Sequence, residues 1–176
     1  MVLVLAATLG AAAAPAKKGA AGGFVWEVPA RWTVMPARSM RAATYAVPGA
    51  TANEAGECAV FYFAGGEGGS IDANVERWSR QFEGTPKPLR SVRMVRGLSV
   101  TLVKLAGAYL APGGPMMQSQ GKRPGYVLVG AIIQTVEGNL FFKLTGPAAT
   151  VSAAQADWES LVASLGPASP PRPPGK

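Results

Sequence analysis

Two short segments of this chain are apolar at every position, and they limit the folds that the sequence can adopt. Residues 58–63 (CAVFYF) and 126–133 (YVLVGAII) are rich in β-branched and aromatic side chains and are short, which favours strands over helices. Successive side chains of a strand point to opposite faces, so both faces of these two strands need cover. The sequence therefore predicts central strands of a sheet that is packed on both sides.

Turn signals divide the rest of the chain into further strands. Gly97 marks a hairpin turn, and residues 137–139 (EGN) mark another. The Gly, Pro and polar content of residues 111–125 predicts a long loop. The remaining predicted strands are residues 24–28, 32–35, 40–47, 89–95, 98–105 and 140–144.

A first helix is predicted after the segment 58–63. Ile71, Val75, Trp78 and Phe82 follow the spacing i, i+4, i+7 and i+11, which places them on one face of a helix of about 13 residues. Ser70 is placed to cap its N-terminus. The four apolar side chains therefore predict a helix that packs on the sheet.

A second helix is predicted over residues 152–165. Ser152 and Gln155 have the spacing of a capping box, and Gly166 ends the helix. Its predicted inner face consists of Trp158, Leu161, Val162 and Leu165. Together these elements predict an α+β fold: a mostly antiparallel sheet of about six to seven strands with a helix packed on each face, an α/β/α sandwich.

The two ends of the chain differ from the middle. Residues 1–16 hold an apolar run that ends in Ala14-Pro15-Ala16, a site of the kind that signal peptidase cleaves, although no Lys or Arg precedes the run. We interpret 1–16 as a signal peptide; an upstream start and an Ala-rich terminus without targeting function stay open as alternatives. Residues 17–23 are predicted to be a flexible spacer, 24–166 a single domain, and 167–176 a disordered Pro-rich tail. The expected location is periplasmic or extracellular.

The order of elements and several short segments resemble a known fold. Three strands, a helix, two hairpins and a C-terminal helix resemble the PsbP-like fold. Residues 57–64, 68–78 and 81–82, with 142–147 before the last helix, resemble a group of uncharacterised exported bacterial proteins. The resemblance spans nearly all of residues 24–166 and implies a fold and export. It carries over no metal-binding, partner-binding or catalytic residue.

The composition narrows the chemistry. The chain has no histidine, which removes the commonest general base and metal ligand, and its carboxylates show no spacing of a paired site. We therefore predict no metal site, no cofactor and no catalytic residue, and lean away from an enzyme. The lone Cys58 opens an apolar strand, where a buried thiol is a better interpretation than a nucleophile.

Positive charge is concentrated in one part of the sequence. Residues 84–136 contain seven basic and no acidic side chains, which accounts for the whole net charge of +7. Such a segment can attract an anionic partner, or it can be a solvated face that binds nothing. Paired methionines in the predicted 111–125 loop suit adaptable contacts. The candidate binding residues are Arg90, Arg93, Arg96, Met116, Met117, Lys122 and Arg123.

Two functional hypotheses follow. The first is an exported, non-catalytic binding or adaptor domain that contacts an anionic envelope component or another protein. The alternative is a small-molecule-binding domain or an enzyme with a cleft under the 111–125 loop. Nucleic acid is the least favoured partner, because no aromatic and basic recognition motif is present. After residues 1–16, no apolar stretch reaches the length of a membrane span.

Overall fold

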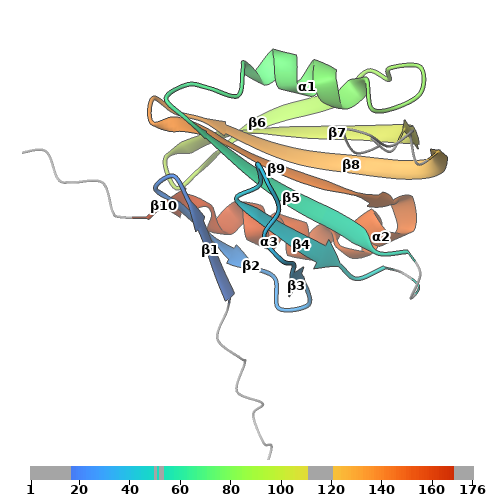
Figure 1. Ribbon diagram of the computed structural model, residues 1–176, viewed down its shortest axis with the longest axis horizontal. Helices are drawn as coiled ribbons and strands as arrows, with labels where there is room; N and C mark the ends of the chain where they lie inside the picture. The colour runs from blue at the N-terminus through green and yellow to red at the C-terminus, as the bar shows by residue number, and fades with distance from the viewer. Residues whose placement is uncertain (1–16, 50, 52–53, 111–120, 169–176) are drawn as a thin grey trace, which may run out of the picture.

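The largest element of the computed structural model is a seven-stranded antiparallel sheet; the structure describes residues 17–49, 51, 54–110 and 121–168 (Figure 1). Its strand order is β3-β4-β5-β9-β8-β7-β6. A smaller sheet has the order β1-β2-β10. The strands are β1 (Lys17–Ala21), β2 (Phe24–Val28), β3 (Thr33–Val34), β4 (Ala43–Val47), β5 (Gly56–Ala64), β6 (Leu89–Val95), β7 (Leu98–Leu110), β8 (Lys122–Gln134), β9 (Gly138–Pro147) and β10 (Gly166–Pro167).

The two segments that are apolar throughout lie inside the large sheet, as predicted. β5 lies between β4 and β9, and β8 lies between β9 and β7. Both predicted hairpins are confirmed. Gly97 adopts a φ of +85° in the turn that places Val95 opposite Leu98, and β8 turns into β9 with Gln134 opposite Asn139.

The first helix, α1 (Ile71–Ser79), begins as predicted and ends early. The Ser70 side chain accepts a hydrogen bond from the backbone N–H of Ala73 at 3.2 Å, so the predicted N-cap is confirmed. The predicted length of about 13 residues is wrong. After α1 the chain pairs with β7 instead: Glu83 N–H donates to the Ala108 carbonyl at 2.9 Å, and Leu110 N–H donates to the Gln81 carbonyl at 2.8 Å.

The predicted second helix is two helices, α2 (Ala148–Ala153) and α3 (Gln155–Ser164). Helical residues begin directly after Pro147, because proline suits a helix start and the alanines that follow favour helix. Ser152 therefore lies inside α2, and the predicted capping box is wrong. The predicted inner face is confirmed: Trp158, Leu161, Val162 and Leu165 are all buried.

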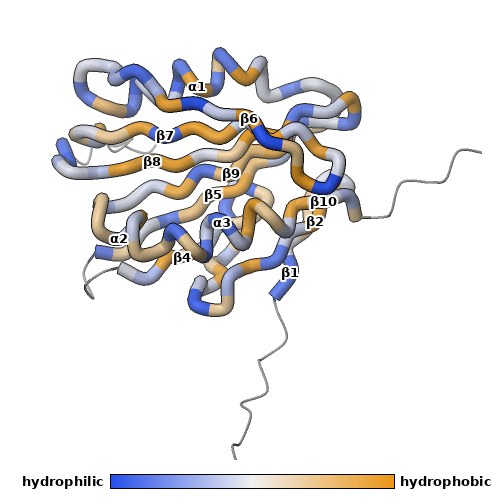
Figure 2. Tube along the Cα trace, turned by 180° about the vertical axis from the view of Figure 1, so that it is seen from behind, coloured by the Kyte–Doolittle hydropathy of each residue, from blue (hydrophilic) through white to orange (hydrophobic). Residues whose placement is uncertain are grey.

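Buried apolar residues form two clusters that use alternate positions of the same strands. On β8, Leu128 and Ile132 belong to a cluster with Trp78 of α1. Val129 and Ile133 belong to the other cluster, with Trp158 of α3. Figure 1 shows α1 on one side of the large sheet, and α2, α3 and the small sheet on the other. Figure 2 shows apolar stretches along β7 and β8 between these layers.

Three predicted boundaries need correction. The tail does not begin at residue 167, because Pro167 pairs with Phe24 as part of β10. Residues 17–23 are not a flexible spacer, because β1 pairs with β2 along its whole length, from Lys17 opposite Val28 to Ala21 opposite Phe24. Gly22 and Gly23 permit this hairpin, with φ values of +55° and +80° that side chains disfavour. The predicted 111–125 loop is shorter on its C-terminal side, since β8 begins at Lys122.

Several predictions lie outside the described residues. They are the signal peptide at 1–16, most of the tail at 167–176, and the segment 111–120 with Met116 and Met117. Within the part of the chain that the structure describes, no helix is both long and apolar enough to cross a membrane.

Candidate functional site

On the face of the large sheet that carries α1, the strands change from apolar to polar along their length. The nine residues of α1 extend about 14 Å at 1.5 Å per residue. The thirteen residues of β8 extend about 44 Å, so α1 leaves much of this face uncovered. Opposite pairs on β5 and β9 become polar away from the helix, from Phe61–Phe141 through Ala59–Lys143 to Glu57–Thr145.

A cavity of about 340 Å³ lies on the polar end of this face, and we call it the sheet cavity. Its walls come from the β3–β4 connection (residues 35–42) and from β5, β7, β8 and β9. These segments are far apart in sequence. They lie close together in space because the sheet places β4, β5, β9, β8 and β7 side by side in that order. Its charged and aromatic walls are Arg38, Arg41, Glu57, Phe61, Tyr109, Arg123, Tyr126 and Lys143.

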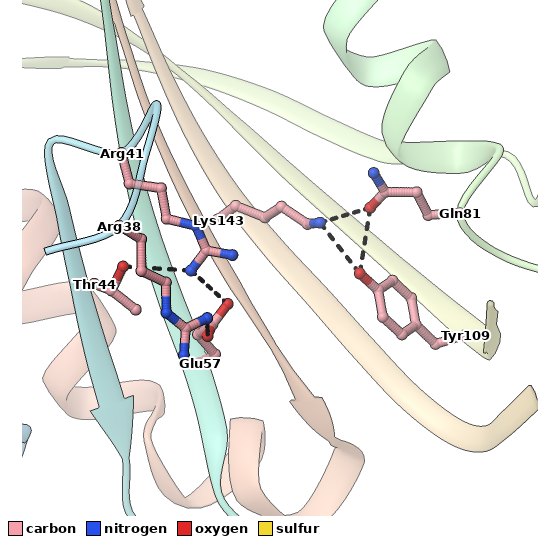
Figure 3. A network of polar contacts seen from close by, with 7 residues as sticks. All are labelled: Arg38, Arg41, Thr44, Glu57, Gln81, Tyr109 and Lys143. Carbon is pink, nitrogen blue, oxygen red and sulfur yellow. Dashed lines mark hydrogen bonds and ion pairs between the residues drawn. The ribbon is translucent and has the colours of Figure 1, made fainter. Parts of the chain in front are cut away.

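A single carboxylate holds two arginines at one side of the cavity (Figure 3). Glu57 Oε1 accepts a hydrogen bond from Arg41 Nη1 at 2.8 Å, and Oε2 accepts one from Arg38 Nη1 at 3.0 Å. Arg41 Nη1 also donates to Thr44 Oγ1 at 3.3 Å, and its guanidinium lies 5.8 Å from the centre of the Phe61 ring. Glu57 therefore fixes both guanidinium groups and neutralises one of the two charges.

Lys143 lies at the base of the cavity without a carboxylate partner among the described residues. Its ammonium donates hydrogen bonds to Gln81 Oε1 at 2.6 Å and to Tyr109 Oη at 3.3 Å. The side chain is half-buried, and this burial lowers its pKa to about 8, with repulsion by Arg41 acting in the same direction. An anion placed beside the ammonium would stabilise its charged form.

Two tyrosines form the aromatic wall. The rings of Tyr109 and Tyr126 stack at a centroid distance of 5.8 Å with an interplanar angle of 6°. Arg123 lies over the Tyr126 ring and donates a hydrogen bond to its hydroxyl oxygen at 3.3 Å. Burial and the nearby Glu57 carboxylate raise the pKa of Tyr109 to about 12, so its hydroxyl stays neutral at pH 7.

The lining therefore carries four cations and one carboxylate. Cations over aromatic rings and beside apolar walls interact more strongly with an anion than they would in water, because the surroundings are less polar. This arrangement suits a carboxylate or phosphate group. It does not suit a metal ion, since Glu57 is the single carboxylate among its described lining residues and is already paired.

The described residues contain no group of three or more Cys, Asp or Glu side chains that could hold a metal ion. Cys58 points to the opposite face from Glu57 and is fully buried, as predicted. Burial raises the pKa of its thiol, which disfavours the reactive thiolate.

The structure does not gather the predicted binding residues on one surface. Arg90 and Arg93 occupy even and odd positions of β6, so their side chains point to opposite faces. Arg90 pairs with Asp72 of α1 at 2.7 Å, and Arg93 pairs with Glu159 of α3 at 2.9 Å. Arg96 is exposed in the β6–β7 turn. These contacts pair two of the seven basic side chains that the sequence places in residues 84–136.

The predicted binding residues Lys122 and Arg123 also lie in different surroundings. Lys122 forms an ion pair with Glu83, outside the lining of the sheet cavity. Its neighbour Arg123 does line the cavity. A cavity thus adjoins the end of the β7–β8 hairpin, the region in which the alternative hypothesis places a cleft. Arg123 is the one predicted binding residue among its described walls.

Sequence reasoning missed Arg38, Arg41, Glu57 and Lys143. The first two lie in a part of the chain where basic and acidic counts balance, so counting charge could not reveal them. Lys143 did leave a signal, because it is a lone charge within the otherwise apolar segment 140–144. Charged side chains are rarely buried in a central strand. Lys143 is an exception because its ammonium group faces the sheet cavity.

The fold is similar to that of a solved structure. The solution structure of cyanobacterial PsbP from Synechocystis sp. PCC 6803 is similar over 92% of this chain and 98% of that one, with a TM-score of 0.56 and 7% sequence identity. The fold is PsbP-like. The predicted resemblance and the predicted α+β class with an antiparallel sheet are confirmed.

Two further structures are similar at a TM-score of 0.49. One is a crystal structure from Bacteroides thetaiotaomicron VPI-5482, at 14% identity over 86% of this chain and 48% of that chain. The present chain therefore spans about half the length of the Bacteroides protein. The other is LpqN of Mycobacterium tuberculosis, described as involved in cell envelope biogenesis, at 12% identity over 87% and 85% of the two chains. No family model and no curated protein sequence matches this chain.

Proposed function

We propose that this chain is an exported, non-catalytic binding domain and that the sheet cavity holds an anionic ligand. The observation that supports the proposal is the excess of cations in the lining, with Lys143 hydrogen-bonded to neutral oxygens and in no ion pair with a carboxylate of the described residues. The proposal combines the two hypotheses from the sequence. The non-catalytic binding role belongs to the first, and the ligand-binding cavity belongs to the alternative.

Electrostatics supports a cavity over an open surface. A pair of opposite charges 4 Å apart gains about 1 kcal/mol in water and about 4 kcal/mol at the lower effective dielectric constant near a protein surface. Lys143 is half-buried and Arg41 is largely buried by its neighbours, with 22% of its side chain exposed. An anion between them therefore gains more than it would beside an exposed arginine.

A surface formed by the basic segment 84–136 is the competing proposal. It would contact an anionic envelope component or another protein through Arg90, Arg93 and Arg96. Arg90 and Arg93 each have a carboxylate of their own, so both charges are matched. In the sheet cavity Arg38 and Arg41 share the one carboxylate of Glu57, which leaves one positive charge over. The cavity is therefore favoured.

The proposed location is periplasmic or extracellular, and it depends on residues 1–16 acting as a signal peptide. Expression of the full chain in a bacterium, followed by mass spectrometry of the N-terminus, tests this part. Cleavage after Ala16 and recovery outside the cytoplasm is the expected result; an uncleaved cytoplasmic chain overturns the export proposal.

Binding is tested by titrating the full chain with acetate, benzoate and inorganic phosphate at low salt, followed by NMR chemical shifts. We expect shifts that cluster at β5, β9 and the β3–β4 connection and that weaken as salt is raised. Arg123→Gln and Lys143→Met should each weaken binding at least threefold.

Lys122→Gln is the matched control for Arg123→Gln. It removes the same charge at the adjacent residue, which pairs with Glu83 away from the cavity. Equal weakening by both variants would show a nonspecific effect of net charge, and the absence of shifts with all three anions would refute the cavity proposal. Weakening by neutralised Arg90, Arg93 and Arg96 alone would favour the basic surface instead.

A further inference from the structure

A second cavity of about 370 Å³ lies beside the sheet cavity, under α1, and we call it the helix cavity. Half of its lining residues are apolar: Met40, Phe61, Phe63, Trp78 and Phe141. The other half are polar: Ser39, Asn74, Arg77, Gln81 and Lys143. No carboxylate is among its described lining residues. Phe61 and Phe63 are only half-buried, so an apolar group placed against them would remove more of their surface from water.

The two cavities are joined by shared walls. Phe61 and Lys143 line both of them. Figure 3 shows the Lys143 side chain reaching from β9 toward Gln81, which lines the helix cavity, with Arg38 and Arg41 on its other side. The ammonium group therefore lies where a cationic space meets an apolar one.

The β3–β4 connection provides a wall for each cavity. Arg38 and Arg41 line the sheet cavity, and the two residues between them, Ser39 and Met40, line the helix cavity. Met40 has a φ of +63° and 78% of its surface exposed, an uncommon combination for a bulky apolar residue. Such strained residues are often found at ligand-binding sites, and a methionine adapts its shape to an apolar partner.

We propose that the ligand of the sheet cavity is an amphiphile, with a carboxylate or phosphate head group beside Arg41 and Lys143 and an apolar chain in the helix cavity. The inference rests on the proposed function, because it needs an anion in the sheet cavity. The charge of one cavity and the aromatic walls of the other determine the direction in which the molecule lies. Both cavities have the size usual for small-molecule sites.

A chain-length series tests the inference. The full chain is titrated by calorimetry with hexanoate, octanoate and decanoate, and with acetate by NMR, all as monomers in solution. Each added methylene group should tighten binding by up to about fourfold until the helix cavity is filled. Decyl phosphate and decanoate have the same chain length and different head groups. The one that binds more tightly shows whether the site prefers a phosphate or a carboxylate. Decanol, which lacks the charge, should bind at least tenfold more weakly than either.

Two variants locate the chain. Ser39→Trp, at an exposed position, places a large side chain in the helix cavity and should remove the gain with chain length while leaving acetate binding unchanged. Met40→Gln should reduce that gain by making the wall polar. Met94→Gln is the matched control, because Met94 is also exposed, at 66%, but lies on β6 outside both cavities.

The outcomes separate the two proposals. Acetate binding without any gain from a longer chain would overturn the amphiphile and leave the anion cavity intact. A gain that persists unchanged in Ser39→Trp and Met40→Gln would place the chain elsewhere and also overturn it. Decanol binding as tightly as decanoate would refute the role of the head group, and no binding of any anion would remove both proposals.

Discussion

The half-buried Lys143 should make the stability of this protein rise with pH over a range in which most proteins change little. Its pKa is about 8 in the folded chain, against 10.5 for an ordinary lysine. Between these values the unfolded chain binds more protons than the folded one, so the free energy of unfolding increases with pH. The full difference corresponds to about 3 kcal/mol at about 1.4 kcal/mol per pH unit. From pH 7 to 9.5 the contribution of Lys143 to the free energy of unfolding should increase by about 2 kcal/mol. The buried Cys58 offsets part of this increase, because burial raises the pKa of its thiol and the folded chain keeps a proton that the unfolded chain loses.

The measurement is urea unfolding at intervals between pH 7 and 9.5, with Lys143→Met as the comparison. Above pH 10 the tyrosines interfere: burial raises the pKa of Tyr45 and Tyr109 to about 12, so the folded chain keeps protons that the unfolded chain loses, and stability falls. Lys143→Met retains the tyrosine and Cys58 effects, so the difference in unfolding free energy between the two proteins should change by about 2 kcal/mol from pH 7 to 9.5. Parallel pH profiles for the two proteins would refute the placement of Lys143 in a poorly solvated cavity.

Three further predictions follow from the same contacts. Anion affinity should fall as pH rises through 8, because Lys143 loses its charge, and calorimetry at pH 7 and 9 would contradict this if the affinities agreed. Gly130→Ala should destabilise the fold by about 2 kcal/mol in urea unfolding, since a Cβ there would lie 2.2 Å from Trp78 Cζ3; a loss below about 0.5 kcal/mol would show that Trp78 does not pack on β8. Cys58, fully buried with a raised pKa, should react with a thiol reagent only as fast as the protein unfolds, so rapid labelling of the native chain would refute its burial.

The sheet was predictable because its signals are local. Segment 58–63 is apolar on both faces and became β5, and Gly97 permits the turn that joins β6 to β7. Elements whose form depends on distant partners were not. Residues 17–21 carry no strand pattern, yet they pair with β2 because Gly22 and Gly23 reverse the chain. Ser152 has the spacing of a cap, but the helix had already begun after Pro147.

The site was mostly beyond sequence reasoning, because its residues meet only through strand order. Glu57 and Lys143 are 86 positions apart, and the pairing of β5 with β9 brings them to one face. Arg123 was predicted because it belongs to a run of the sequence, residues 84–136, that contains basic and no acidic side chains. Arg90 and Arg93 belong to the same run, yet their positions on β6 direct them to separate carboxylates. The charge of a segment therefore indicated an anion without locating where it would bind.

The early end of α1 explains why a cavity exists on this face at all. An apolar stripe that reaches Phe82 would extend the helix farther along the sheet, over the strand ends that carry Lys143 and Glu57. Instead the chain leaves the helix after Ser79 and hydrogen-bonds to β7, which keeps Phe82 buried against Tyr109. The same departure places Gln81 Oε1 2.6 Å from the Lys143 ammonium. One change of backbone direction thus both uncovers the polar part of the sheet and supplies the oxygen that stabilises a lysine there. Burial lowers the pKa of this lysine, so its charged form destabilises the fold in a way that a methionine would not, and the proposed anion would offset that cost.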